Sequence, residues 1–385
     1  MEKWVSTFHI AHARFFDFNI TKKRSVRIVF PNNVIGNKIR LKLANDFAEN
    51  SAKIGEITIA ECMEDGILTG SAIPVMVKGG KETILGVGEV LYTDEVAFDI
   101  SYNTYIAVTM YFPEQPIIRA GGNTGRYALR TLEGNYCNSK NIRIDNDYHT
   151  VLPDGTAYEV EYPIPLLKSV EIQTKTKVKI VTVFGDSITA QCKWFTPFVK
   201  KLYVAYPGQV ACGNNGVSGN QLLYDSPIMY QDAFGISGLH RFEEDVLSLA
   251  GLTHCIVALG TNDIGNAGVV DPNQKMPALE ELLEAYRLLV KKAKGKQIKM
   301  VFMSILPRID EMMNEEKEHI RQSVNQAVKE GQFFDQYIDL EQVMGIQGKN
   351  MLNPAYYATD GLHLNDTGGL HLCQALDVKE IYADE

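Results

Sequence analysis

The stretch that decides the fold is Val178–Ile188, which reads Val-Lys-Ile-Val-Thr-Val-Phe-Gly-Asp-Ser-Ile. Its first half is a short apolar run rich in β-branched residues, the composition of a strand that is buried on both faces of a parallel sheet. Gly185 ends this run, and Ser187 follows two residues later. Open α/β sheets bind their ligands at the carboxyl ends of the strands. The stretch therefore predicts a parallel sheet with a hydroxyl placed where such a sheet carries its chemistry.

Residues 173–385 alternate between predicted strands and helices. Strands are expected at 178–185, near Gln209, and at 253–259, 298–306 and 334–340, and helices at 196–205, 239–249, 277–294, 315–330 and 370–382. The helix at 277–294 is the clearest, because Pro277 stands in its first turn, glutamates come early, lysines come late, and Gly295 ends it. This alternation predicts an α/β domain in which helices cover both faces of a parallel sheet.

Residues 1–172 have the pattern of an all-β domain. The run Lys38–Leu43 alternates polar and apolar residues with a period of two, as a half-buried strand does. Similar runs follow one another along the segment, separated by Gly and Asn turn clusters, and no repeat of fixed period is visible. We therefore expect a jelly-roll-like β-sandwich domain over residues 1–172, followed by the α/β domain over residues 173–385.

Composition limits the classes of partner. The 385 residues carry 38 basic and 47 acidic side chains, a formal net charge of -9, so nucleic acid is not expected as a partner. No apolar stretch has the length of a membrane span, and the N-terminus lacks a basic region followed by an apolar core. We therefore expect a cytoplasmic protein with no membrane partner. A homo-oligomer is compatible with the sequence, but nothing in the sequence indicates one.

The cysteine and histidine patterns give little reason to expect a metal site. The six cysteines are scattered, and no two of them have CxxC spacing, which is typical of free thiols in a reducing compartment. His9 and His12 have a possible metal-ligand spacing, but no cluster of cysteine or glutamate lies near them. A structural or surface role is therefore favoured for both histidines.

Polar residues follow the predicted strands of the α/β domain in four segments, Gly185–Ser187, Gly216–Asn220, Gly260–Asp263 and Asp360–His363. Because the carboxyl ends of parallel strands lie at one edge of the sheet, segments far apart in the sequence can meet there. Acyl transfer needs a nucleophile, a base, a group that orients the base, and hydrogen-bond donors for the oxyanion. The four segments hold a candidate for each of these roles.

Ser187 is the candidate nucleophile and His363 the candidate base. Asp360 lies three residues before His363, so its carboxylate can accept a hydrogen bond from the Nδ1–H of the imidazole. The candidate oxyanion donors are the backbone N–H groups of Ser187 and Gly219 and the side-chain amide of Asn262. A glycine at position 219 lets the backbone approach a substrate because it has no Cβ.

These four segments resemble blocks I, II, III and V of the SGNH-hydrolase superfamily, the GDSL esterases and lipases. The resemblance assigns the family's functional residues to Ser187, Gly219, Asn262, Asp360 and His363. Gly-Asp-Ser-Ile differs from the family's Gly-Asp-Ser-Leu by one apolar exchange, and the Gly-x-Ser-x-Gly elbow of the α/β-hydrolases is absent. The resemblance covers residues 177–385. It implies a flavodoxin-like three-layer α/β/α domain that hydrolyses esters through an acyl-enzyme, with no cofactor and no metal.

Longer stretches resemble a two-domain branch of this superfamily. They are Ile39–Phe47, Asn214–Asn220, Arg241–Leu247 and Ala258–Gly265. In that branch a β-sandwich precedes the catalytic domain, and its members include acetyl esterases linked to xylan and other plant polysaccharides. The resemblance implies a carboxylic ester hydrolase of the acetylesterase type, acting on small acyl groups of a small-molecule or oligosaccharide ester.

Two other functions remain open. A thioesterase or lysophospholipase of the same superfamily would need a long apolar acyl channel, which the sequence does not reveal. A carbohydrate-binding protein with an inactive hydrolase domain is disfavoured because Ser187, Asn262 and His363 are intact. The β-domain could bind glycan, or it could only wall the active site.

Several residues near these motifs have a structural alternative. Asp186 and Asp263 are interpreted as residues that hold their own loops, although Asp186 also stands with Asn220 and Tyr224 as a candidate substrate contact. The segment 221–238 has no helical or strand periodicity. It is expected to form a pocket wall, a lid, or a long surface loop.

Overall fold

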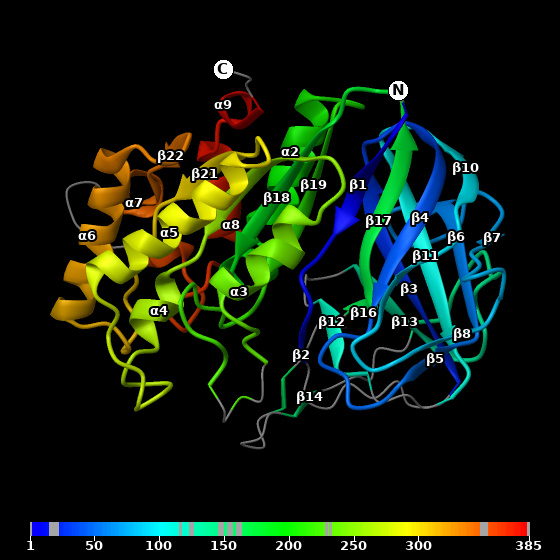
Figure 1. Ribbon diagram of the computed structural model, residues 1–385, viewed down its shortest axis with the longest axis horizontal. Helices are drawn as coiled ribbons and strands as arrows, with labels where there is room; N and C mark the ends of the chain where they lie inside the picture. Colours follow the sequence, from blue (N-terminus) through cyan, green and yellow to red (C-terminus); the bar gives the residue numbers. More distant parts are fainter. Residues whose placement is uncertain are drawn as a thin grey trace. The chain divides into compact units, whose positions relative to one another are not determined.

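The computed structural model describes residues 2–14, 23–114, 118–122, 127–144, 150–151, 157–158, 164–227, 230, 233–346 and 353–382. The chain forms two compact units (Figure 1). Unit 1 comprises Met1–Val178 and Pro207–Ala211, and unit 2 comprises Lys179–Tyr206 and Cys212–Glu385. The expected boundary between residues 172 and 173 falls inside a strand of unit 1, Leu167–Thr174.

Unit 1 consists of antiparallel sheets, as the period-two pattern predicts. One sheet has the order β1 (Lys3–His9), β17 (Leu167–Thr174), β4 (Gly36–Ala44), β10 (Val96–Ile100), with β9 (Val90–Tyr92) also paired to β4. A second has the order β13 (Ala128–Glu133), β3 (Arg24–Asn32), β11 (Thr104–Phe112), β6 (Glu56–Cys62), β7 (Ile73–Pro74). Three smaller sheets contain β2 (Ala13–Arg14), β12 (Ala120–Gly122) and β16 (Ile164–Pro165); β5 (Ala52–Ile54) and β8 (Thr83–Leu85); and β14 (Thr150–Val151) and β15 (Ala157–Tyr158).

The two larger sheets of unit 1 contact each other through apolar side chains. Phe8 on β1 stacks on Phe30 on β3 with 4.4 Å between the ring centroids, and both side chains are buried. The β11 strand pairs along its whole length with β3, so that Ile106 lies opposite Phe30. The predicted β-rich first domain is confirmed, whereas its jelly-roll-like strand order stays a prediction.

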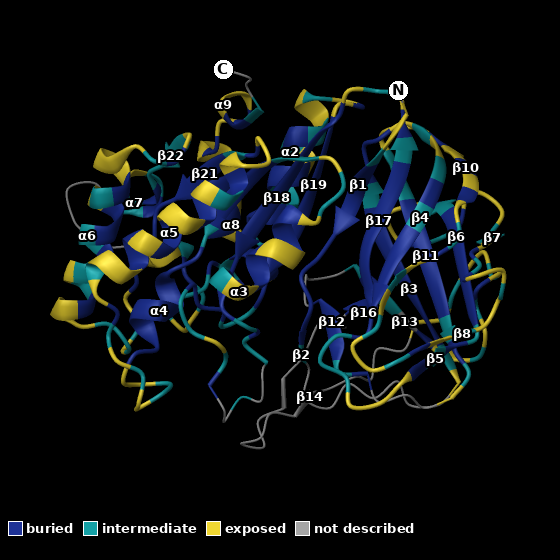
Figure 2. Ribbon diagram, viewed as in Figure 1, coloured by how far each residue is buried: buried dark blue, intermediate teal, exposed yellow. Residues whose placement is uncertain are grey.

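Unit 2 is an α/β domain built on a five-stranded sheet. The order is β19 (Val210–Gly216), β18 (Lys179–Gly185), β20 (Leu252–Ala258), β21 (Lys299–Met303), β22 (Gln336–Ile338). The pairs β18–β20, β20–β21 and β21–β22 are parallel. All seven residues of β18 are buried, as Figure 2 shows along the strand. The strand expected from the opening stretch is therefore confirmed, and it lies inside the sheet.

Helices flank this sheet. They are α1 (Ser187–Ala190), α2 (Phe195–Ala205), α3 (Gly238–Phe242), the π-helix η2 (Glu243–Leu247), α4 (Thr261–Gly265), α5 (Leu279–Lys294), α6 (Glu315–Gly331), α7 (Leu340–Met344), the 3-10 helix η3 (Pro354–Tyr356), α8 (Asp366–Ala375) and α9 (Val378–Tyr382). Figure 1 shows α3 and α5 in front of the sheet and α8 behind it. Apolar residues of α5, such as Leu282 and Leu289, share a buried core with Val257 and Phe302 of the sheet.

The expectation of one closing helix over residues 370–382 is wrong, because two helices occupy this part of the chain. Lys201 on α2 donates hydrogen bonds from its ammonium group to the carbonyl oxygens of Cys373, Gln374 and Leu376. These bonds satisfy carbonyl groups that would otherwise continue the helical ladder, and Leu376 leaves helical geometry at ψ 118°. The cation that ends α8 comes from a distant element, which the local sequence cannot reveal.

No helix among the residues that the structure describes combines the length and the apolar character needed to cross a membrane. None of the six cysteines, all of which lie among the described residues, forms a disulfide.

Candidate active site

Ser187 is the first residue of α1, directly after β18 and the capping residue Asp186. The Asp186 side chain accepts a hydrogen bond from the Ile188 N–H at 3.0 Å, which begins the helix. The Ser187 N–H has no partner within the helix, because the first N–H groups lie outside the helical ladder. Gly216 of the neighbouring strand makes room for this turn, since a Cβ there would lie 2.5 Å from the Ala190 nitrogen. Close packing of β19 against α1 thus fixes the position of the serine.

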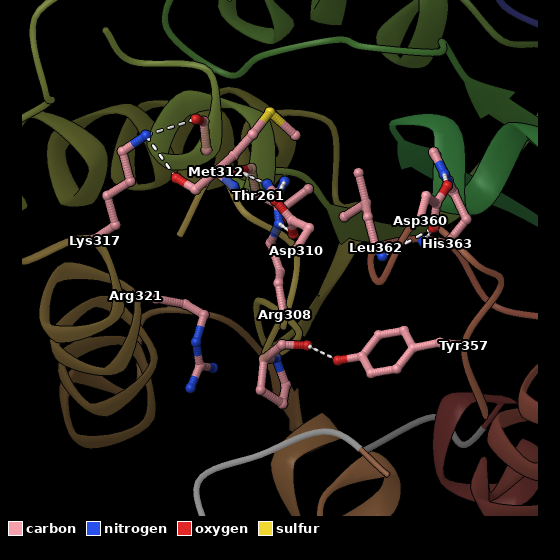
Figure 3. Close-up of polar contacts among 12 residues, drawn as sticks. Thr261, Arg308, Asp310, Met312, Lys317, Arg321, Tyr357, Asp360, Leu362 and His363 are labelled. Atoms are coloured by element: carbon pink, nitrogen blue, oxygen red, sulfur yellow. Dashed lines mark hydrogen bonds and ion pairs between the residues drawn. The ribbon is translucent and has the colours of Figure 1, made fainter. Parts of the chain in front are cut away.

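Ser187, His363 and Asp360 form a continuous hydrogen-bonded chain. The His363 Nε2 lies 2.8 Å from the Ser187 Oγ, and the His363 Nδ1 lies 2.5 Å from the Asp360 Oδ2. The other oxygen of Asp360 accepts the backbone N–H groups of Leu362 and His363, at 3.0 and 2.9 Å (Figure 3). Burial tends to raise the pKa of Asp360, but these hydrogen bonds outweigh it and hold the pKa below its usual value. The carboxylate is thus held in its charged form beside the imidazole.

Asn262 and Gly219 come together from the two other motifs. The Asn262 side-chain amide donates a hydrogen bond to the Asn220 carbonyl at 3.0 Å and is 3% exposed. Gly219 adopts φ +75°, and a Cβ there would lie 2.4 Å from the Phe234 ring, so only glycine fits. The structure therefore brings Asn262 against the turn that contains Gly219, and it brings His363 to Ser187.

Arg241 ties the first two motifs together, a role that the sequence did not reveal. Its guanidinium donates to the Gly185 carbonyl at 2.9 Å, to the Asn215 carbonyl at 3.0 Å and to the Asn220 side chain at 2.8 Å. It is 3% exposed and pairs with Asp245 at 3.2 Å. Burial lowers the pKa of Arg241 from its usual value, although the Asp245 carboxylate opposes this. The sequence predicts a helix over 239–249 and places Arg241 in a stretch that resembles the two-domain branch, but neither observation indicates these hydrogen bonds.

Asp263 and Asn220 act within the protein. The Asp263 carboxylate accepts the backbone N–H groups of Leu222 and Leu223 at 2.7 and 2.8 Å, and burial raises its pKa to about 6 against these bonds. Asn220 is fully buried, and its amide donates to the carbonyl oxygens of Phe234 and Ile236. Both N–H groups of the Asn220 amide are therefore occupied. On sequence alone Asn220 is a candidate substrate contact, but in this geometry its amide has no N–H to donate to a substrate.

The remaining two candidate substrate contacts differ in access. Asp186 is 2% exposed, and burial raises the pKa of its carboxyl to about 7, with the Ile188 N–H opposing the rise. Its capping role is the one expected for a residue that holds its own loop. Tyr224 is half-buried, and burial raises the pKa of its hydroxyl. Of the two, Tyr224 is the side chain that a ligand could reach.

Segment 221–238 is anchored at both ends by Asp263 and Asn220. Residues 228–229 and 231–232 of the segment lie outside the described residues. Tyr230 and Phe234 stack with their ring centroids 4.3 Å apart, and the Phe234 ring packs on Gly219. An aromatic pair thus stands next to a candidate oxyanion donor, as a pocket wall would.

A cavity of about 30 Å³ lies beside the turn that carries the nucleophile. Its lining includes Asp186, Ile188 and Thr189, together with Thr261, the first residue of α4, and Ser304, which follows β21. Ser187 does not line it, so the cavity lies behind the turn rather than around the hydroxyl. Its volume admits a water molecule and no long acyl chain.

The two histidines with metal-like spacing have separate surroundings. His9 is buried, and burial lowers its pKa to about 3. His12 lies 3.3 Å from the Asp46 carboxylate and 3.1 Å from the Leu167 carbonyl. Within the described ranges of the chain, no three His, Cys, Asp or Glu side chains are grouped so that they could hold a metal ion.

Residues 183–369 match the profile of the GDSL-like Lipase/Acylhydrolase family. Comparison with curated proteins gives no match. Among solved structures, a GDSL-like lipase from Bacteroides thetaiotaomicron is 21% identical, with 54% of this chain and 90% of that chain covered and a TM-score of 0.38. An acetylxylan esterase from Geobacillus stearothermophilus is also 21% identical, with 54% and 98% covered and a TM-score of 0.39.

The matched range contains all four motifs and the hydrogen-bonded chain from Asp360 to Ser187. Residues 183–369 of unit 2 thus form a GDSL-like lipase/acylhydrolase (SGNH) domain, which makes the protein a hydrolase of ester bonds.

Proposed function

We propose that this hydrolase is a serine esterase that removes small acyl groups, chiefly acetyl, from carbohydrates through an acyl-enzyme. The observation that carries the proposal is a chain of two contacts. The Ser187 hydroxyl lies 2.8 Å from one nitrogen of the His363 imidazole, and the other nitrogen lies 2.5 Å from the Asp360 carboxylate. A nucleophile within reach of a base, with the base oriented by a third group, is the arrangement that covalent acyl transfer requires.

In the first half of the reaction the Ser187 Oγ attacks the ester carbonyl while the His363 Nε2 takes its proton. The Asp360 carboxylate stabilises the imidazolium that forms. The oxyanion receives hydrogen bonds from the N–H groups of Ser187 and Gly219 and from the second amide N–H of Asn262. The C–O bond to the alcohol then breaks, and His363 returns the proton to the leaving alkoxide.

In the second half a water molecule attacks the acyl-enzyme. His363 takes a proton from the water as the new C–O bond forms, and the same donors stabilise the second oxyanion. The bond between the acyl carbon and the Ser187 Oγ breaks, His363 protonates that oxygen, and the carboxylic acid leaves. The ester, the water molecule and the residues named account for every atom and proton that moves in this cycle.

The choice of an acetylated carbohydrate rests on the sequence resemblance to the two-domain branch. The stacked pair Tyr230 and Phe234 supports it, since aromatic faces offer an apolar surface to the C–H face of a sugar ring. A thioesterase or lysophospholipase is the outcome that a test on substrates would reveal instead.

The test compares wild-type protein with Ser187→Ala on 4-nitrophenyl acetate, with the exposed Ser71→Ala as the control. Ser187→Ala should abolish turnover and Ser71→Ala should not change it; retained activity in Ser187→Ala would remove this serine from the mechanism. Wild type is then given acetylated xylo-oligosaccharides, palmitoyl-coenzyme A and lysophosphatidylcholine. Preference for either long-chain substrate would overturn the carbohydrate assignment.

The cytoplasmic location expected from the cysteine pattern belongs to this proposal. The absence of a disulfide among the six cysteines supports it, because a reducing compartment keeps thiols reduced. Cell fractionation with an antibody to the chain checks the location.

A further inference from the structure

The segment Pro307–Asp310, which follows β21, meets the loop that carries His363. The Ile309 N–H donates to the Gly361 carbonyl at 3.3 Å. The Tyr357 hydroxyl donates to the Pro307 carbonyl at 3.0 Å (Figure 3). The contact is close, because a Cβ on Gly361 would lie 3.1 Å from the Asp310 nitrogen. One side of this segment therefore holds the loop between Asp360 and His363.

The other side of the same segment holds the helix that begins with Thr261 and Asn262. The Arg308 Nη1 donates to the Thr261 carbonyl at 3.1 Å, and the Thr261 hydroxyl lies 3.4 Å from the same nitrogen. A Cβ on Gly265 would lie 2.0 Å from that nitrogen, so the guanidinium packs directly on α4. Arg308 is 7% exposed. This arginine therefore joins the Asn262 helix to a segment that also carries the His363 loop.

The Arg308 guanidinium is itself held rigidly. Its Nε and Nη2 donate to the two oxygens of Asp310 at 2.6 and 2.9 Å, a bidentate pair. Asp310 also accepts the backbone N–H of Met312 at 3.0 Å. Because Asp310 neutralises the arginine, the pair has no net charge with which to attract an anionic ligand. Its geometry is that of a fixed link between helix α4 and the segment that holds the His363 loop.

We infer that Arg308 is a positioning residue: with Asp310 it sets the distance between the Asn262 amide and the His363–Ser187 pair. The inference rests on the proposed function, since it assigns no chemistry to Arg308 itself. Without the guanidinium, each catalytic group stays present, but the oxyanion donor and the base lose their common support. A misplacement of about 1 Å in such an arrangement lowers the rate by about 10²-fold.

Arg321 provides a matched control for a purely structural role. It is 1% exposed, and its guanidinium donates to the Ile305 carbonyl at 2.8 Å and to the Glu318 carboxylate. It therefore supports the chain just before Pro307, yet these bonds do not go to Thr261 or to the His363 loop. Figure 3 shows the two arginines on separate parts of the structure. Loss of Arg321 should lower stability without disturbing the distance between the catalytic groups.

The experiment measures kcat, KM and the melting temperature of full-length Arg308→Ala, Arg308→Lys and Arg321→Ala with 4-nitrophenyl acetate. Arg308→Ala should lose about 10²-fold in kcat with KM nearly unchanged, and millimolar guanidinium should restore part of the loss. Arg308→Lys should stay impaired, because an ammonium cannot form the bidentate pair. At assay temperatures below its melting temperature, Arg321→Ala should have the same kcat as wild type, and added guanidinium should not change it. Equal kcat losses in the two alanine variants would overturn the inference.

A double-mutant cycle covers the case in which Arg308→Ala folds poorly. If Arg308 acts by positioning Asn262, then adding Arg308→Lys to Asn262→Ala should lower kcat by much less than Arg308→Lys lowers it alone. Fully multiplicative losses would contradict the inference while leaving the esterase proposal intact. Activity retained in Ser187→Ala would instead remove the proposed function, so the two failures are distinguishable.

Discussion

Asn262 uses one of its two amide N–H groups on the Asn220 carbonyl, and this bond orients the carboxamide. The second N–H is left for a substrate oxyanion. We expect Asn262→Ala to lower kcat for 4-nitrophenyl acetate by about 10²–10³-fold, the usual effect of losing one such donor. Steady-state kinetics should show little change in KM. A raised KM with normal kcat would mean that Asn262 binds the ground state instead.

Asp186 gives the chain a pH-dependent stability. Burial raises the pKa of this carboxyl from its usual 3.8 to about 7, against the Ile188 N–H and the charge of Arg308, which lower it. Because the folded state binds this proton more tightly, the group lowers the stability of the fold as pH rises from about 4 to about 7. The neutral side chain of Asp186→Asn escapes this effect.

The melting temperature of Asp186→Asn relative to wild type should therefore rise between about pH 5 and about pH 8. The direction follows from the raised pKa alone. Differential scanning fluorimetry of both proteins at the two pH values measures the difference. A difference that is the same at both values would show that the carboxyl is not protonated in the fold.

The residues that carry reactive groups could be predicted from the sequence, and so could Asp186 and Asp263 as residues that hold their own loops. The two arginines that join distant segments could not. Ser187 and His363 stand in short motifs whose side chains have a recognisable chemistry. Arg241 and Arg308 donate to backbone carbonyl groups 56 and 47 residues away, at Gly185 and Thr261. Every residue has a carbonyl, so such a partner leaves no mark on the sequence.

At the scale of elements, segment 221–238 places an aromatic pair beside a candidate oxyanion donor. Its anchors are internal, and its stacked rings Tyr230 and Phe234 stand beside Gly219. We expect Tyr230→Ala to raise KM for acetylated xylo-oligosaccharides about two- to tenfold, the range of one lost aromatic contact. Kinetics with 4-nitrophenyl acetate, which has no sugar, should stay unchanged in the same variant. Equal effects on both substrates would indicate a disturbed Gly219 turn instead.

The order of the elements in unit 2 was predictable because each strand or helix has an apolar periodicity of its own. The residues at which the elements end were less predictable. Lys201 on α2 ends α8, and the predicted helix at 239–249 changes from α3 to the π-helix η2 at Glu243. The η2 turn contains Asp245, the partner of Arg241. Contacts of this kind join distant elements, so a local propensity cannot foretell them.

At the scale of the whole molecule, every residue of the candidate site belongs to unit 2. Unit 1 was recognisable as all-β from its alternating pattern, and its sheets are antiparallel. The order of its strands depends on pairings across the full unit, such as β1 with β17. Strands with nearly equal patterns can pair in many orders, which is why the topology of unit 1 was less predictable than its class.

The thiols test the burial of both units in solution. Five are buried, and burial raises the pKa of each of them: Cys62, Cys137, Cys212, Cys255 and Cys373. The pKa values of Cys62 and Cys137 are raised to about 12. Cys192 is the partly exposed one. Disulfide reagents attack thiolates that they can reach, so we expect 5,5′-dithiobis(2-nitrobenzoic acid) to label about one thiol quickly in the native protein. All six should react after denaturation. Cys192→Ser should abolish the fast reaction, whereas fast labelling that survives this substitution would mean that a buried thiol becomes exposed in solution.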